Sequence, residues 1–145
     1  MIGKYVVDLG SGGGLPGIPL AITNPQKQFL LVESNTKKAS FLLNTVTRLN
    51  LHNTEVINDR IENIDSSNFP DRFDIVSRAV GSIEANIALT EQLLKKKGVY
   101  LKLMKTEDQF FKEHLPTGYN VKKIDKYLTK TKDKTRILVT IEKVQ

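Results

Sequence analysis

The sequence contains no cysteine among its 145 residues, and only two histidines. The absence of cysteine excludes disulfide frameworks, thiolate zinc sites, iron–sulfur clusters and cysteine nucleophiles, and it is consistent with a reducing cytoplasm. His52 and His114 lie far apart in the sequence, and no spacing typical of a metal site is present. The longest apolar runs, such as residues 29–32, are far shorter than the roughly 20 residues that a membrane-spanning helix needs. We therefore expect a cytoplasmic protein without a metal site or a membrane segment.

The length and the charge distribution bound the organisation of the chain. A chain of 145 residues suits a single domain, which we place at residues 1–145. The net charge of +6 is uneven, because residues 1–94 carry a net charge of −2 and residues 95–145 carry +8. Such asymmetry favours a surface for an anionic partner. The alternative is an ordinary solvated surface that is rich in lysine.

Short apolar runs alternate with helical patterns along most of the chain. We predict strands at residues 4–9, 28–32, 54–58, 72–77, 99–103, 119–127 and 136–142. Helices are predicted from Pro16 to Ile22, after a cap at residues 34–36, around residues 83–94, and at residues 107–115. Leu42, Val46 and Leu49 would share one face of the second helix. The third helix is predicted from the spacing of Ile83, Ile87, Thr90 and Leu94. This order predicts an open, doubly wound α/β sheet that is mostly parallel, with a C-terminal antiparallel strand pair. Its ligand is expected beyond the carboxyl ends of the strands, near the first strand.

The loop after the first strand points to the chemistry of that ligand. It has the pattern Asp-x-Gly-x-Gly-x-Gly from Asp8 to Gly14, whereas the dinucleotide pattern Gly-x-Gly-x-x-Gly would need glycine in place of Leu15. A carboxylate at the strand tip disfavours a pyrophosphate at the helix N-terminus but favours the sulfonium and ammonium groups of S-adenosylmethionine. Asp8 therefore indicates a methyl donor. The alternative role for Asp8 is a carboxylate that caps the loop.

Two further acidic residues follow the second and third strands. Glu33 lies 23 residues after Gly10, where a carboxylate can accept both hydroxyls of a ribose. NAD-binding proteins share this feature, and a plain surface charge is the alternative. Asp59 follows the third strand, where its side chain or a backbone amide can meet an adenine edge.

Three segments have a distinctive sequence, namely residues 6–21 (VVDLGSGGGLPGIPLA), 33–42 (ESNTKKASFL) and 75–79 (IVSRA). Together they resemble the glucose-inhibited division protein B family. The resemblance covers essentially the whole chain and weakens after Gly98. It implies a Rossmann-like class I methyltransferase fold, S-adenosyl-L-methionine as cofactor, and methylation of a guanine N7 in 16S ribosomal RNA of the small ribosomal subunit.

The resemblance also implies roles for individual residues. The donor-binding set would be Asp8, Gly10, Gly12, Gly14, Leu15, Glu33, Ser34, Asp59, Ile61, Glu62 and Arg78. The RNA-binding set would be Lys37, Arg60, Arg78 and Lys105. Arg78 and Lys105 would act at the catalytic centre. Lys102 competes with Lys105 for this role, because the family's pattern fits Lys105 only with a shift of one residue. A salt bridge to Asp74 or Glu84 is the alternative for Arg78.

The chemistry of guanine N7 limits what the site must supply. N7 carries an in-plane lone pair and no proton, so methyl transfer needs positioning and water exclusion but no general base. Arg78 would bind an RNA phosphate or the guanine O6 edge. A lysine-rich C-terminal region would add salt-dependent attraction to RNA. Its members are Lys122, Lys123, Lys126, Lys130, Lys132, Lys134 and Arg136.

Family members carry a helical segment of roughly 60 residues before the first strand, close to half an ordinary domain. Only five residues precede Val6 here, so we expect a chain that is truncated at its N-terminus relative to the family. Separately, we expect a monomer. One alternative function is a catalytically impaired remnant of the fold that binds RNA or a partner. Another is a methyltransferase acting on a small molecule or a protein.

Overall fold

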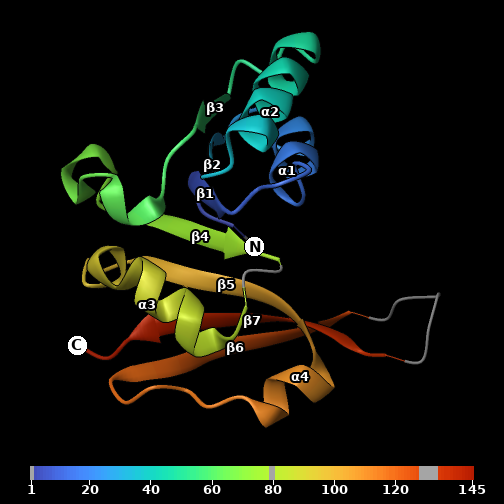
Figure 1. Ribbon diagram of the computed structural model, residues 1–145. Coiled ribbons are helices and arrows are strands. Elements are labelled where there is room, and N and C mark those ends of the chain that lie inside the picture. Colours follow the sequence, from blue (N-terminus) through green and yellow to red (C-terminus); the bar gives the residue numbers. More distant parts are fainter. Residues whose placement is uncertain (1, 79–80, 128–133) are drawn as a thin grey trace.

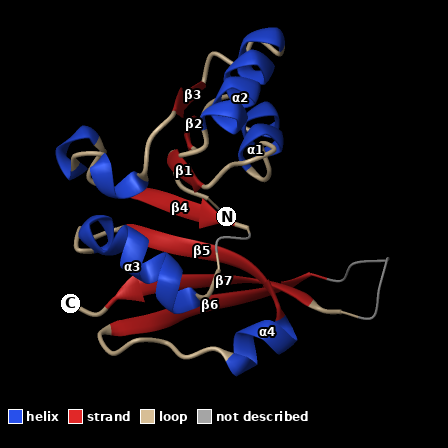
Figure 2. Ribbon diagram, in the orientation of Figure 1, coloured by secondary structure: helices blue, strands red, loops and turns tan. Residues whose placement is uncertain are grey.

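A seven-stranded sheet with helices packed on it forms the centre of the protein (Figures 1 and 2). The computed structural model describes residues 2–78, 81–127 and 134–145. The strands are β1 (Tyr5–Leu9), β2 (Gln28–Val32), β3 (Thr54–Ile57), β4 (Phe73–Ser77), β5 (Val99–Thr106), β6 (Tyr119–Tyr127) and β7 (Arg136–Lys143). The helices are α1 (Gly17–Thr23), α2 (Thr36–Arg48), α3 (Ile83–Leu94) and α4 (Glu107–Lys112), with the 3₁₀ helices η1 (Ile61–Asn63) and η2 (Ser66–Asn68).

The strand order is β3-β2-β1-β4-β5-β7-β6. The first five strands run parallel, and β7 is antiparallel to both of its neighbours, β5 and β6. This arrangement confirms the predicted fold class and the antiparallel pair at the end of the chain. The order reverses between β1 and β4, so the loops after these strands diverge and leave a crevice at their carboxyl ends.

Helices cover the two faces of the sheet in different places. On one face, α1 packs on the apolar side chains of β1, β2 and β4, and α2 packs beside it through Leu42 and Val46. On the other face, α3 buries Ile83, Ile87, Thr90 and Leu94, the four positions whose spacing predicted a helix. The main core lies between α3 and strands β1, β4, β5 and β7.

Several boundaries differ from the sequence prediction. Strand β5 continues to Thr106 because β7 pairs with it beyond the end of β4. Helix α4 ends at Lys112, three residues earlier than predicted. Leu49 was expected to extend the buried face of α2, but it lies at the C-cap and is 49% exposed. Helices η1 and η2 were not predicted, because three residues are too short to show a periodic pattern.

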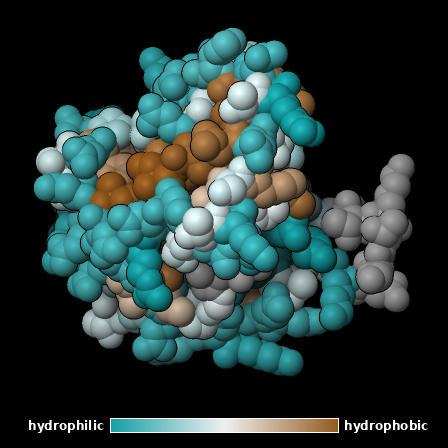
Figure 3. All heavy atoms as spheres, turned by 45° about the horizontal axis from the view of Figure 1, so that its top comes forward, coloured by the Kyte–Doolittle hydropathy of each residue, from teal (hydrophilic) through white to brown (hydrophobic). Residues whose placement is uncertain are grey.

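The surface is mostly hydrophilic, although hydrophobic residues gather in a band across the face shown in Figure 3. Among the described residues, no helix is both long enough and apolar enough to cross a bilayer.

Candidate nucleoside-binding site

The glycine loop turns the chain from the end of β1 into α1. Gly10, Gly12 and Gly14 all have positive φ angles, of 68°, 51° and 87°, which glycine adopts without steric cost. The amide of Gly10 donates to the carbonyl of Val32 at 3.0 Å, so the start of the loop stays attached to β2. At Gly10, the loop therefore presents backbone to the crevice.

A fourth glycine makes the close packing behind this loop possible. A Cβ on Gly17 would lie 2.4 Å from Leu31 Cδ2 and 2.5 Å from Asp8 Oδ2. Real Cβ atoms do not approach other atoms so closely, so only glycine allows the first residue of α1 to touch β1 and β2. Sequence reasoning assigned no role to Gly17, because the glycine pattern that it followed ends at Gly14.

Asp8 lies behind the loop and does not point into the crevice. Its side chain is 1% exposed, and Oδ2 accepts a hydrogen bond from the amide of Gly17 at 2.8 Å. Oδ1 has no hydrogen-bond partner in residues 2–78, 81–127 and 134–145, and burial raises the pKa of this carboxyl from 3.8 to about 7. The structure thus gives Asp8 the loop-capping contact that was the alternative interpretation. Its position corrects the expectation of a carboxylate at the mouth of the site, and its role toward the donor stays a prediction.

A cleft of about 220 Å³ opens at the carboxyl ends of β1 and β2. Most of the residues predicted to bind the donor's nucleoside meet there, although they come from four separate segments of the chain. The lining is Leu9, Gly10, Val32, Glu33, Ser34, Asp59, Arg60, Ile61, Glu62 and Leu89. The cleft combines backbone from the glycine loop, three carboxylates and one cation with an apolar floor.

Glu33 is the acidic group that the cleft holds most rigidly. Its side chain is 7% exposed, Oε1 accepts from the amide of Gly12 at 3.0 Å, and Oε2 accepts from the amide of Asn35 at 3.3 Å. Each carboxylate oxygen has a further lone pair available, so the group can accept two hydroxyls at once. The hydrogen bond from Gly12 also fixes the glycine loop relative to the end of β2.

The third wall of the cleft is the segment around η1. Asp59 Oδ1 accepts from the amide of Arg60 at 2.7 Å and from Asn63 Nδ2 at 2.8 Å. The hydrogen bond from Asn63 is the main cause that lowers the pKa of Asp59, so this carboxylate stays ionised. Ile61 is buried and supplies an apolar surface beside it.

These features define the kind of ligand that fits. A buried carboxylate at the end of β2 suits a ribose diol, and the apolar side chains of Leu9, Val32, Ile61 and Leu89 suit a flat base. Among the residues that line the cleft, three carboxylates stand against one cation, Arg60, so a pyrophosphate would be repelled. The geometry fits a nucleoside that carries positive charge in place of phosphate.

Sequence reasoning missed Leu89, which lines the cleft from α3. The core-facing positions of that helix are Ile83, Ile87, Thr90 and Leu94, and Leu89 lies off this stripe. The signal available in the sequence was a leucine outside the apolar stripe of an otherwise regular helix.

Other predicted residues lie outside the cleft. Gly12 and Gly14 shape the loop, whereas Leu15 is 47% exposed and Lys37 is exposed at the start of α2. Arg78 follows β4 directly and is exposed, and no ion pair to Asp74 or Glu84 forms among the residues that the structure describes. The alternative role of Arg78 as a salt-bridge residue is therefore not observed.

The two candidate lysines of β5 occupy different environments. Lys105 Nζ lies 2.8 Å from Glu113 Oε1 and donates to the carbonyl of Gly81 at 3.2 Å. The other oxygen of Glu113, Oε2, accepts from the amide of Ile83 at 3.0 Å, so the pair connects the end of β5 to the start of α3. Lys102 lies in the middle of β5, beside Val76 of β4. Lys105 is thus the lysine near the carboxyl edge, and its ammonium already has partners.

Three lysines of the lysine-rich C-terminal region form ion pairs. Lys122 pairs with Glu142, Lys123 with Asp125, and Lys126 with Glu107. Lys130 and Lys132 lie outside the described residues. No group of three or more potential metal ligands occurs in the described part of the chain.

Comparison with protein families gives a match over most of the chain. The profile of the family described as GidB, rRNA small subunit methyltransferase G, matches residues 2–139. A ribosomal RNA small subunit methyltransferase G of Hydrogenovibrio crunogenus is 37% identical over 144 residues, which cover 98% of this chain and 65% of that protein. The protein of the same name from Legionella pneumophila (strain Corby) is 44% identical over 99 residues, 68% of this chain and 47% of that protein. This chain spans less than two thirds of the length of either relative.

Solved structures share the fold at low sequence identity. An rRNA methylase from Streptococcus thermophilus is similar with a TM-score of 0.62 and 18% identity, covering 98% of this chain and 87% of that one. A mutant of MtNAS in complex with S-adenosylmethionine is similar with a TM-score of 0.71 and 15% identity, covering 99% and 56%. At such identities the similarity establishes the fold alone, and it agrees with the predicted Rossmann-like methyltransferase sheet.

Proposed function

Since the chain belongs to the GidB family, rRNA small subunit methyltransferase G, we propose that it methylates guanine N7 in small-subunit (16S) ribosomal RNA. The methyl donor in this proposal is S-adenosyl-L-methionine. The observation that carries the proposal is the acid-lined cleft, in which Glu33 accepts a hydrogen bond from the glycine loop. Its lining contains a single cation, Arg60, and so lacks the cluster of cations that would bind a phosphate. We further propose that the protein acts in the cytoplasm as a monomer, without a metal ion.

In this proposal, different residues of the cleft bind different parts of the donor. Glu33 would accept the ribose hydroxyls, Ile61 and Leu89 would pack on the adenine, and the backbone of Gly10 and Gly12 would lie against the methionine part. When bound, the donor supplies an electrophilic methyl group on a sulfonium. The protein then needs only to align the guanine with this methyl and to exclude water, because N7 has no proton to remove.

Arg78 is the residue best placed to engage the RNA. It is exposed directly after β4, at the carboxyl edge of the sheet and beside the switch point between β1 and β4. A guanidinium there can bind a phosphate or the O6 edge of the target guanine. Lys105 is held between Glu113 and Gly81, so in this proposal it positions the loop before α3.

Titration of the protein with S-adenosylmethionine in a calorimeter tests the donor site. We expect binding that Glu33→Gln weakens by about 2 kcal/mol, since a charged acceptor is lost from the ribose. Glu55→Gln, which changes an exposed carboxylate on β3, is the matched control and should bind normally. Absence of binding by the wild-type chain would instead favour a remnant of the fold without catalytic function.

Transfer of labelled methyl groups tests the substrate. Purified small ribosomal subunits should accept the label, and free tRNA and protein should not. Arg78→Ala should reduce transfer to the RNA by about tenfold or more, as expected for one lost charge-assisted contact, while donor affinity stays unchanged. A collapse of donor affinity in this variant would contradict the RNA-binding role of Arg78.

A further inference from the structure

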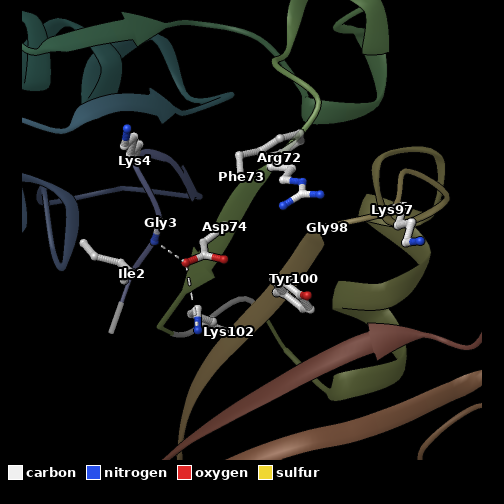
Figure 4. A pocket seen from close by; sticks show the side chains of 10 residues that line it. All are labelled: Ile2, Gly3, Lys4, Arg72, Phe73, Asp74, Lys97, Gly98, Tyr100 and Lys102. Carbon is white, nitrogen blue, oxygen red and sulfur yellow. Dashed lines mark hydrogen bonds and ion pairs between the residues drawn. The ribbon is translucent and has the colours of Figure 1, made fainter.

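A second and larger hollow, of about 610 Å³, lies at the amino ends of β4 and β5, beside the residues that precede β1 (Figure 4). The strands run parallel, so this is the opposite edge of the sheet from the nucleoside cleft. The charged side chains around the hollow are mostly cations. They are Lys4, Arg72, Lys97 and Lys102, with Asp74 as the single carboxylate.

Asp74 already interacts with Gly3 and Lys102. It is 5% exposed, and Oδ2 accepts from the amide of Gly3 at 2.7 Å. The same oxygen lies 3.9 Å from Lys102 Nζ, the contact drawn between them in Figure 4. One carboxylate therefore offsets at most one of the four cations, and the hollow keeps a surplus of positive charge.

Lys102 is a buried ammonium with poor partners. Its side chain is 10% exposed, and its contacts to acceptors are long, with Thr140 Oγ1 at 3.5 Å and Asp74 Oδ2 at 3.9 Å. Both distances exceed those of a good hydrogen bond to an ammonium. Burying a cation with unfilled donors is costly, and an anionic oxygen entering the hollow would fill them.

The other three cations form no ion pair among residues 2–78, 81–127 and 134–145, and all three are exposed. The side chain of Arg72 extends toward Gly98, whose Cβ, if present, would lie 2.9 Å from Arg72 Cγ. Gly98 also has a positive φ of 87°. Glycine at this turn therefore leaves space for the guanidinium between β4 and β5, while Lys4 and Lys97 lie on opposite rims.

The positive surface continues beyond this hollow. A neighbouring hollow of about 310 Å³ shares Lys97, Gly98 and Tyr100 with it and adds Lys96, Lys122 and Lys143. Its lining also includes Glu142, which pairs with Lys122, so cations still outnumber carboxylates there. Tyr100 lies between the two, and Lys122 Nζ is 4.5 Å from the centre of its ring. A series of cations with an aromatic ring between them is typical of a surface that follows a nucleic-acid backbone.

We propose that this basic surface binds consecutive phosphates of the ribosomal RNA substrate, as a second contact remote from the methylation site. The inference rests on the proposed function for the identity of the RNA. Strands β1 and β4 have five residues each, about 17 Å at 3.3 Å per residue, so one folded RNA can reach both edges of the sheet. An acidic protein is the less suitable partner, because the exposed rim offers cations and no large apolar anchor of the kind that dominates protein interfaces.

The test compares two triple variants that remove the same charge. Lys4→Gln, Arg72→Gln and Lys97→Gln remove the unpaired cations of the hollow. Lys38→Gln, Arg48→Gln and Lys112→Gln remove three exposed cations elsewhere. Affinity for fluorescently labelled 16S ribosomal RNA is measured by anisotropy over a series of salt concentrations, and donor affinity is measured by calorimetry.

The hollow variant should weaken RNA binding at about 100 mM salt by about tenfold or more and lower the slope of log affinity against log salt by about 2. The control variant should lower that slope by less than about 1, and both variants should bind the donor normally. Equal losses in the two variants, or no loss in either, would overturn the inference. Binding of a poly-glutamate peptide in place of RNA would also overturn it. Failure of the wild type to bind the donor would count against the proposed function alone, because the RNA titration does not depend on the donor.

Discussion

Two carboxylates are buried on the same face of neighbouring strands, yet their surroundings are opposite. Asp8 on β1 and Asp74 on β4 lie two register positions apart, since Asp8 is paired with Val76. Asp8 receives one backbone hydrogen bond, from Gly17, and forms no ion pair with any described residue. Asp74 receives a backbone hydrogen bond and also faces the ammonium of Lys102.

The contrast shows how one sheet provides two edges of different charge. In the cleft at the carboxyl edge, carboxylates outnumber cations, which suits a cationic nucleoside. At the amino edge, cations surround one carboxylate, which suits an anion. Asp8 and Asp74 are the same residue type on the same face of the sheet. Their different surroundings follow from their positions along the strands, and the two functions that we propose lie at opposite strand ends.

Replacing Asp8 gives the largest effect and tests this contrast directly. Its raised pKa means that the folded protein holds a proton between about pH 4 and 7 that the unfolded chain releases. Stability should therefore fall as the pH rises through this range, and Asp8→Asn should remove that loss. Relative to wild type, the variant should gain up to about 4 kcal/mol in the free energy of unfolding between about pH 4 and pH 8.

Urea denaturation at a series of pH values measures this difference. Asp71→Asn, which changes an exposed carboxylate, is the control and should run parallel to wild type. If the Asp8→Asn curve also ran parallel to wild type, the buried, uncompensated state of Asp8 would be refuted.

Gly17→Ala should have the next largest effect, because the added methyl group meets both Asp8 and a buried leucine of β2. We expect a loss of about 2 kcal/mol in the free energy of unfolding, together with weaker donor binding as the loop moves. Gly13→Ala is a matched control, since nothing lies within 4 Å of the position that its added methyl group would take. If the two variants were equally stable in thermal unfolding, the close packing at Gly17 would not be required for stability, and the prediction would be contradicted.

Lys105→Gln should give the smallest effect, and it distinguishes a structural role of Lys105 from a catalytic one. Glu113 would lose its cation while keeping the hydrogen bond to Ile83, so we expect a loss of about 1 kcal/mol in stability. Methyl transfer, measured at a temperature where the variant is fully folded, should fall only slightly. A large fall in the rate with unchanged stability would instead assign Lys105 to the catalytic centre.

The fold was largely predictable from the sequence because its signals are local. Alternating apolar runs and helical stripes placed all seven strands and four helices, and the short final connection predicted the antiparallel pair. The errors occur where tertiary contacts decide. Pairing with β7 lengthens β5, and Leu49 follows the helical spacing but lies at the end of α2.

The site was predictable where residues follow strand ends, as Glu33 and Asp59 do. It was not predictable where the orientation of a side chain decides its role. Position in the sequence placed Asp8 at the strand tip but could not show that its side chain turns toward Gly17. Nor could it show that Lys102 faces a hollow at the far edge, because pairing of β4 with β5 creates that hollow.

The lysines of β6 also affect how this edge strand can interact with other protein chains. Within the described part of the chain this strand pairs only with β7, so its outer backbone groups have no strand partner and offer a template to another chain. Lys122, Lys123 and Lys126 are exposed along it, and an irregularity interrupts its pairing with β7 between Val121 and Lys123. Charged side chains and bulges on an outermost strand oppose strand addition, so these residues also protect the protein from aggregation.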